Sequence, residues 1–170
     1  IPTEAIPVTR TADAHVWTMS TAFKNLMGDV ANSEFSMVCE WTPKFDFGDT
    51  DSLPGVIHID SNTGIFLFGH NNSGSFISDS GLVSSTIKPF YSANTTYIFA
   101  LRVYDDAGTM KFEVGEKHGG SWAWDATPAT YDSSYNPSTE FLIGYLNQYP
   151  FNIKNIYFYD EAKTQAWIED

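Results

Sequence analysis

The sequence predicts an all-β fold, an antiparallel sandwich of two sheets followed by a short C-terminal helix. Three observations predict it. Apolar and polar residues alternate over many short segments, turns rich in Asp, Asn, Ser and Gly separate these segments, and 170 residues suffice for one domain that buries about two thirds of its unfolded surface. The expected strands cover residues 35–42, 55–60, 64–69, 75–78, 96–104, 109–115, 121–124, 140–145 and 152–159.

Two of the turns predict hairpins. Residues 60–64 (DSNTG) and 105–108 (DDAG) carry the Asx and Gly residues that tight turns need at positive φ. Strand 55–60 should therefore pair with 64–69, and strand 96–104 with 109–115. In the second hairpin one face is apolar and faces the core, with Phe99, Leu101, Val103, Met110, Phe112 and Val114, while Arg102, Lys111 and Glu113 point outward.

The two ends of the chain differ from its middle. Residues 1–33, which open with two prolines in extended spacing, are expected to form a linker and the first strand or strands arriving from an upstream region. Residues 34–170 are expected to form the sandwich. At the C-terminal end, Asp160 is expected to cap a helix of one or two turns over residues 161–168.

The charge of the chain excludes two classes of partner. Nine basic residues stand against 21 acidic ones, which gives a formal charge of -12. The chain has no basic run that could release counterions from nucleic acid, and its apolar stretches are far shorter than the roughly 20 residues needed to span a bilayer. We expect no nucleic-acid partner and no membrane insertion.

The chain contains one cysteine, Cys39. It lies in an alternating run on the same side as Phe35, Met37 and Trp41, so we expect a buried and inert thiol rather than a catalytic or metal-binding one.

Several segments resemble laminin-G or concanavalin A-like jelly-roll domains. These are residues 35–41 (FSMVCEW), 97–104 (YIFALRVY), 141–144 (FLIG) and above all 153–162 (IKNIYFYDEA), which is similar to the closing strand of that family. The resemblance covers about residues 34–168. It implies two curved antiparallel sheets, with a ligand at the concave face or on the rim loops.

Residues 1–13 (IPTEAIPVTRTAD) resemble a junction sequence found in bacteriophage tail-fibre and tail-spike proteins. This second resemblance implies a C-terminal lectin-like module of a virion fibre. It also implies synthesis in the host cytoplasm, localisation to the virion and a homotrimer in the parent protein.

The patterns of known enzymes with the concanavalin fold are absent. Their glucanases carry carboxylates in an E-x-D-x-x-E pattern on one strand, which aims the acid and the nucleophile at one cleft. Here Glu113 and Glu116 fall on opposite faces, and Glu40 has no acidic residue two positions away. The lyases of this fold use a Gln-x-His strand, and His58 lacks that Gln. We expect no enzymatic activity, and therefore no cofactor.

Calcium is the one metal that the sequence raises, because many members of the resembled family hold it at the rim of the sandwich. Asp46, Asp49 and Asp51 could supply oxygen ligands, as could the Asp pair of the 105–108 turn. Neither run matches a defined calcium loop, and Asp in a turn commonly bonds its own backbone. We expect no metal that the fold requires.

Candidate ligand contacts gather between residues 122 and 149. Trp122 and Trp124 are two apart, so in a strand they share a face and can stack on sugar rings, unless both rings belong to the core. Carboxylates and amides nearby can bind hydroxyls, and the tyrosines lie in loops rich in Pro, Ser and Asn. The candidates are Trp122, Trp124, Asp125, Tyr131, Tyr135, Asn147 and Tyr149.

Three functions are consistent with these observations. Our first expectation is a non-catalytic module that binds a bacterial surface polysaccharide or another glycan. The first alternative is a structural trimerisation or tip domain of a virion fibre, in which the surplus aromatics pack between protomers. The second is a polysaccharide-degrading enzyme of the same fold, which the missing carboxylate pattern disfavours.

Overall fold

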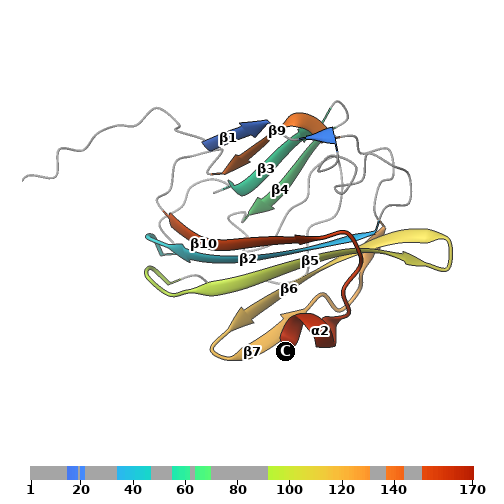
Figure 1. Ribbon diagram of the computed structural model, residues 1–170. Helices are drawn as coiled ribbons and strands as arrows, with labels where there is room; N and C mark the ends of the chain where they lie inside the picture. Colours follow the sequence, from blue (N-terminus) through green and yellow to red (C-terminus); the bar gives the residue numbers. More distant parts are fainter. Residues whose placement is uncertain are drawn as a thin grey trace, which may run out of the picture.

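The protein forms two antiparallel β-sheets, stacked one over the other (Figure 1). The computed structural model describes residues 15–18, 20–21, 34–46, 55–61, 64–69, 92–130, 137–143 and 151–170. The four-stranded sheet has the order β1 (His15–Thr18), β9 (Pro137–Ile143), β3 (Gly55–Ser61) and β4 (Gly64–Gly69). The six-stranded sheet has the order β10 (Phe151–Tyr159), β2 (Phe35–Pro43), β5 (Tyr97–Asp106), β6 (Thr109–His118) and β7 (Ser121–Trp124), with β8 (Ala129–Thr130) also paired to β6.

This arrangement confirms the predicted all-β sandwich. Each expected strand that falls within the described residues is present, and both expected hairpins form, β3 with β4 and β5 with β6. The strand expected at 75–78 lies outside the described residues. β8 was not predicted. β1, which pairs with β9, lies within residues 1–33, where the sequence predicted the first strand or strands.

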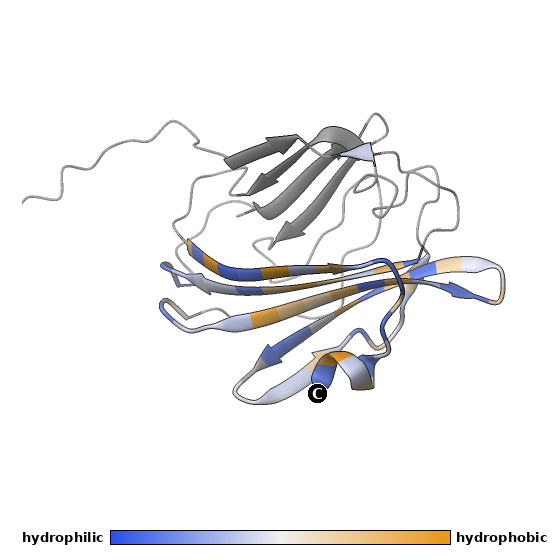
Figure 2. Ribbon diagram, viewed as in Figure 1, coloured by the Kyte–Doolittle hydropathy of each residue, from blue (hydrophilic) through white to orange (hydrophobic). Residues whose placement is uncertain are grey.

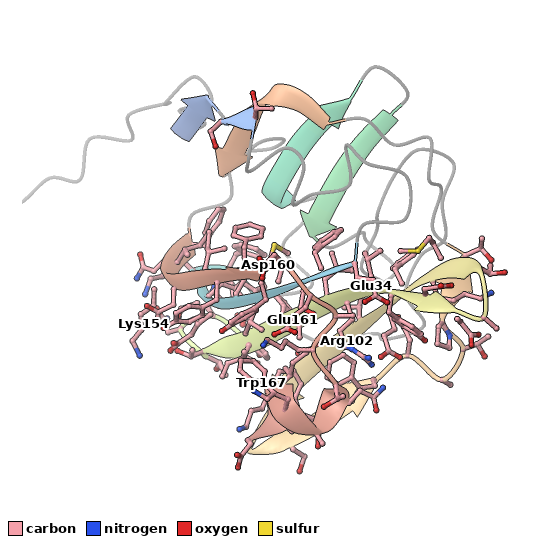
Figure 3. All side chains as sticks on the ribbon, turned by 45° about the vertical axis from the view of Figure 1, so that its right-hand side comes forward. Glu34, Arg102, Lys154, Asp160, Glu161 and Trp167 are labelled. Atoms are coloured by element: carbon pink, nitrogen blue, oxygen red, sulfur yellow. The ribbon has the colours of Figure 1, made fainter. Side chains whose placement is uncertain are left out.

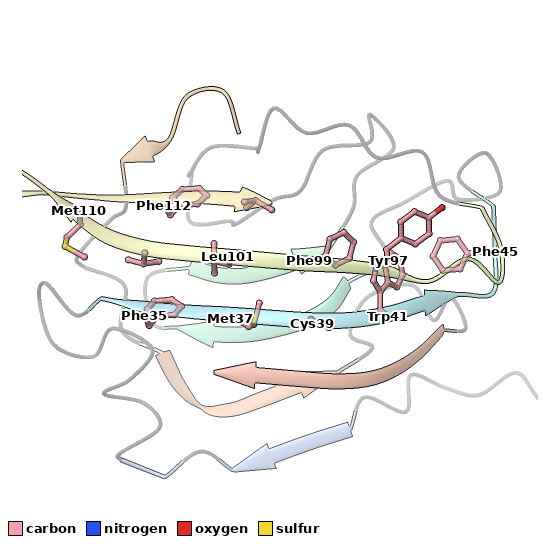
Figure 4. Packing of buried hydrophobic residues seen from close by; sticks show 12 residues of the cluster. Phe35, Met37, Cys39, Trp41, Phe45, Tyr97, Phe99, Leu101, Met110 and Phe112 are labelled. Atoms are coloured by element: carbon pink, nitrogen blue, oxygen red, sulfur yellow. The ribbon is translucent and has the colours of Figure 1, made fainter. Parts of the chain in front are cut away.

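The core lies on the inner face of the six-stranded sheet, the face turned toward the four-stranded sheet (Figure 4). Alternation along the strands sends every second side chain there, as the burial of β2 and β5 shows, and it is visible as alternating orange and blue along β10 (Figure 2). Trp41 is fully buried and packs against Phe99 and Phe151, with ring centroids 5.3 and 6.1 Å apart. The cluster comprises Phe35, Met37, Cys39, Trp41, Phe45, Tyr97, Phe99, Leu101, Val103, Met110, Phe112 and Val114.

The thiol of Cys39 belongs to this core, as the alternation predicts. It is fully buried, and burial raises its pKa to about 12. A thiol with such a pKa stays protonated at neutral pH and is a poor nucleophile.

The C-terminal tail crosses the outer face of the six-stranded sheet. Figure 3 shows Arg102, Glu161 and Trp167 on the side of that sheet away from the four-stranded one. The helix α2 (Gln165–Glu169) is shorter than predicted, and its N-cap is Thr164, whose hydroxyl accepts a hydrogen bond of 3.1 Å from the amide of Trp167.

The expected cap at Asp160 was therefore wrong, for a reason that involves the sheet. The hydroxyl of Ser36, on β2, donates to the carbonyl of Glu161 at 3.1 Å and accepts from the amide of Lys163 at 2.8 Å. A helix starting at 161 would use the carbonyl of Glu161 for its first turn, and a capping Asp160 would need the amide of Lys163, so the Ser36 hydroxyl competes with both. The helix begins after this anchor. None of the described helices is long and apolar enough to span a membrane.

Candidate ligand-binding face

The two tryptophans singled out from the sequence lie on the outer face of the six-stranded sheet. In the β6–β7 pairing, Trp124 is opposite Gly115 and Trp122 is opposite Lys117. These positions alternate with Val114 and Glu116, which face inward, so neither indole enters the core cluster. Both side chains are half-buried, which removes the alternative that the rings are core.

The turn between β6 and β7 sets this register. Gly119 and Gly120 connect the strands, with φ angles of +59° and +88°. A two-residue turn with both residues at positive φ suits the twist of a hairpin, and glycine adopts it without strain. Because this turn fixes which residues stand opposite each other, it places Lys117 beside Trp122.

The indoles form a stacked pair that lies close to the sheet. The ring centroids of Trp122 and Trp124 are 5.5 Å apart, and the planes are inclined by 18°. Gly115 makes room for Trp124, since a Cβ at that position would lie 2.7 Å from two carbons of the indole. The absence of a side chain at Gly115 therefore allows the Trp124 ring to pack directly against the backbone of β6.

The ring nitrogens of the pair have different surroundings. Trp124 Nε1 donates to a carboxylate oxygen of Glu169, on α2, at 2.6 Å. Trp122 Nε1 is buried and meets no acceptor within the part of the chain that the structure describes. The ammonium of Lys117 lies 5.9 Å from the centroid of the Trp122 ring, a cation–π arrangement.

Asp125 does not join this pair. Its side chain is buried, one carboxylate oxygen accepts from the amide of Val114 at 2.9 Å, and its own amide donates to the Val114 carbonyl at 3.0 Å. Through these two bonds Asp125 extends the hydrogen bonding between β6 and β7 by one residue beyond the end of β7. We assign Asp125 to the fold and leave it out of the site.

The remaining candidates lie mostly outside the described residues. Tyr131, Tyr135, Asn147 and Tyr149 do so, as do Asp49 and Asp51. Asp46 is described, and one of its carboxylate oxygens accepts from the amide of Ala93 at 2.8 Å, a bond to a distant part of the backbone and not to its own turn. Within the described ranges no group of three or more His, Cys, Asp or Glu residues is placed to hold a metal ion.

The carboxylates of β6 face opposite sides, as their spacing predicts. Glu113 points outward, is ion-paired with Arg102, and accepts from the side chain of Gln165 at 3.1 Å, all beneath the C-terminal tail. Glu116 points inward opposite Phe99, and burial raises the pKa of its carboxyl to about 8. The two groups do not converge on one cleft.

Sequence reasoning missed two residues of this face, Gly115 and Lys117. A signal for both was present. The Gly-Gly pair at 119–120 predicts a two-residue hairpin turn, and counting outward from that turn pairs 118 with 121, 117 with 122 and 115 with 124.

Comparison with known proteins finds similarity in structure but not in sequence. No protein-family model matches the sequence, and no curated protein matches it either. One similar solved structure is that of a mutant of Trypanosoma rangeli sialidase displaying trans-sialidase activity. Its sequence is 11% identical to this chain, and the two structures superpose with a TM-score of 0.53. The alignment covers 82% of this chain and 22% of that chain, so this chain spans about a fifth of the sialidase. At this identity the likeness shows a shared β-sheet fold alone.

Proposed function

We propose that this chain is a non-catalytic glycan-binding module whose ligand lies on the outer face of the six-stranded sheet, at Trp122. The observation that carries the proposal is a stacked tryptophan pair on the solvent side of an edge strand, outside the core. Large aromatic rings stabilise a fold most when they are buried in its core, and these two rings lie outside the core. Binding of a ligand would explain why they lie there. Flat aromatic rings are good platforms for the apolar C–H faces of sugars.

The electrostatics of the described residues support binding without catalysis. Most glycosidases use two carboxyl groups on either side of one bond. Glu113 and Glu116 face opposite sides of the sheet, and Glu113 is already held by Arg102 and Gln165. The similar solved structure is named as a sialidase, which is consistent with a sugar ligand here.

The biological setting of the proposal rests on the resemblance of residues 1–13 to fibre junctions. On that basis we place the module in a phage tail fibre or another virion appendage, as one of three copies that recognise a bacterial surface polysaccharide. Its competitor is a structural tip domain without a sugar ligand. That alternative draws support from Tyr157 and Trp167, whose side chains are 50% and 49% exposed.

An array of bacterial surface polysaccharides, followed by calorimetric titration of the glycans retained, tests the proposal. One aromatic platform contributes on the order of 1 kcal/mol, so Trp122→Ala should weaken binding about fivefold to tenfold. Tyr157→Ala is the matched control, because it removes an exposed ring from β10, at the opposite edge of the same sheet. It should leave the affinity within twofold of the original.

Two results would contradict the proposal. A folded Trp122→Ala protein with unchanged affinity would place the site elsewhere, and Tyr131→Ala with Tyr135→Ala would then test the loop that the sequence also nominated. An empty array, together with a stable trimer in sedimentation, would favour the structural tip domain.

A further inference from the structure

Most of the described basic side chains lie on the outer face of the six-stranded sheet or on the tail that crosses it. The chain carries a formal charge of -12, yet five of its six described Lys and Arg side chains lie on the outer face of the six-stranded sheet or on the tail that crosses it. Lys44 is the sixth and hydrogen-bonds Asn94. The five are Arg102, Lys111, Lys117, Lys154 and Lys163.

Four of these five cations already have polar partners. Arg102 is ion-paired with Glu113, Lys154 with Glu40 and Lys163 with Glu161. Lys111 donates to the hydroxyl of Thr130 at 3.1 Å.

Lys117 is the exception among the described residues. It makes no hydrogen bond or ion pair with them, and its recorded contact is the face of the Trp122 ring, 5.9 Å from the centroid. That distance is at the long end for a cation–π contact, so a better partner can draw the ammonium away. Trp122 Nε1 is buried, so a ligand on this face would meet the Trp122 ring and not its N–H group.

We propose that Lys117 and Trp122 form a subsite for an acidic sugar, with the ligand carboxylate paired to the Lys117 ammonium and its ring stacked on Trp122. This inference rests on the proposed function and names the ligand class of that same site. An ammonium group without a polar partner, next to the face of an aromatic ring, favours a ligand that carries negative charge and also has an apolar face. A uronic acid in a polysaccharide supplies a carboxylate and an apolar ring face in one residue.

The surrounding charges limit which acidic glycan fits. Glu169 lies beside Trp124, and Glu40 shares a row across the sheet with Lys117 but is held by Lys154 and Asn155. The net charge of the whole chain repels dense polyanions. We therefore expect a glycan with isolated carboxylates among neutral residues, and weak binding of heavily sulfated chains.

The probe is an oligosaccharide of a glucuronate-containing bacterial capsule, compared with its carboxyl-reduced form, in which each glucuronate becomes glucose. The original protein should bind the acidic form at least tenfold more tightly than the reduced one, and added salt should narrow that difference. Lys117→Gln should remove the preference without weakening the reduced form. Lys111→Gln is the matched control, with the same change of charge on the same face of the same strand, and should keep the preference.

The outcomes separate this inference from the proposed function. If both forms bind equally and Lys117→Gln changes neither affinity, the acidic subsite is excluded while glycan binding at Trp122 stands. If Lys111→Gln removes the preference as fully as Lys117→Gln, general charge rather than a subsite explains it, and the inference is overturned. If neither form binds and the polysaccharide array is also empty, the inference and the proposed function fail together.

Discussion

The position of Trp124 depends on the residue opposite it, Gly115. A methyl group added there would lie 2.7 Å from the six-membered part of the indole, closer than real Cβ contacts approach. We expect Gly115→Ala to push the ring off the strand and to lengthen its 2.6 Å hydrogen bond to Glu169. The expected loss of unfolding free energy is about 1–3 kcal/mol, measured by urea denaturation.

A double-mutant cycle separates this clash from other effects of the alanine. In a Trp124→Ala background the three atoms nearest to the added methyl are gone, so Gly115→Ala should then cost less than half as much. Equal costs in both backgrounds would show that the indole is not what excludes a side chain at 115.

Residue-level prediction from the sequence succeeded where alternation decides the outcome. The side of Cys39 and the opposite directions of Glu113 and Glu116 follow from strand periodicity alone. Asp125 was predicted to contact the ligand, but its carboxylate accepts a hydrogen bond from the amide of Val114 at the end of β7. The spacing of residues along the sequence does not reveal such a bond between strands. The pairing of Lys117 with Trp122 was open to prediction, but only by counting from the 119–120 turn.

Among the elements, the C-terminal tail depends most on contacts made far away in the sequence. Ser36 is fully buried on the outer side of β2, and its hydroxyl holds the backbone of both Glu161 and Lys163. Further along, Trp167 packs edge-on against Tyr159 at 5.0 Å, and Gln165 reaches Glu113. The tail thus has its polar anchor at one residue of a distant strand.

We expect Ser36→Ala to loosen this tail. Removing the hydroxyl leaves a carbonyl and an amide without their bonds, which should cost about 1–3 kcal/mol of unfolding free energy and speed amide exchange between residues 160 and 170. Ser92→Ala, which changes an exposed serine, is the control and should alter neither. Unchanged exchange in the tail of the Ser36 variant would show that the contacts of Gln165, Trp167 and Glu169 hold the tail without the Ser36 hydroxyl.

The elements that the sequence predicted well are those with long alternation. β2, β5 and β10 carry nine or ten residues each, enough for a period of two to stand out. β8 has two residues, and a segment that short shows no period. The start of α2 was missed because local capping preference favoured Asp160, whereas the bonds from Ser36 keep residues 161–163 out of the helix.

The fold and the candidate site depend on different positions of the sandwich. An identity of 11% to a similar structure shows that very different sequences reach this β-sheet arrangement, provided that the inward positions stay apolar. The outward positions are not constrained in that way. The two tryptophans and Lys117 lie at outward positions, so these side chains and not the fold bear on the identity of the ligand.

One inward position departs from the apolar rule and gives the whole protein a pH-dependent stability. Glu116 faces the core opposite Phe99, is 4% exposed, and has no hydrogen bond to any described residue. Burial disfavours its charged form and raises its pKa from 4.5 to about 8. The energy of folding therefore depends on whether this carboxyl holds a proton.

The sign of the effect follows from comparing the folded and unfolded chains. Below about pH 4.5 the carboxyl is protonated in both, so its charge costs nothing. Between pH 4.5 and 8 the unfolded chain loses the proton while the folded chain keeps it, and the contribution of Glu116 to stability falls as the pH rises. Above pH 8 both states are ionised and the loss is constant.

Glu116→Gln should abolish this dependence, because the amide has nearly the same shape and cannot ionise. Relative to the original protein, the variant should gain little at pH 4.5 and on the order of 1–3 kcal/mol at pH 8, measured by urea denaturation across that range. Asp160→Asn, which makes the same carboxyl-to-amide change on an exposed side chain, is the control and should not reproduce this gain. A Glu116→Gln difference that stays flat from pH 4.5 to 8 would mean that the carboxyl is ionised in the folded protein, with a partner inside the sandwich.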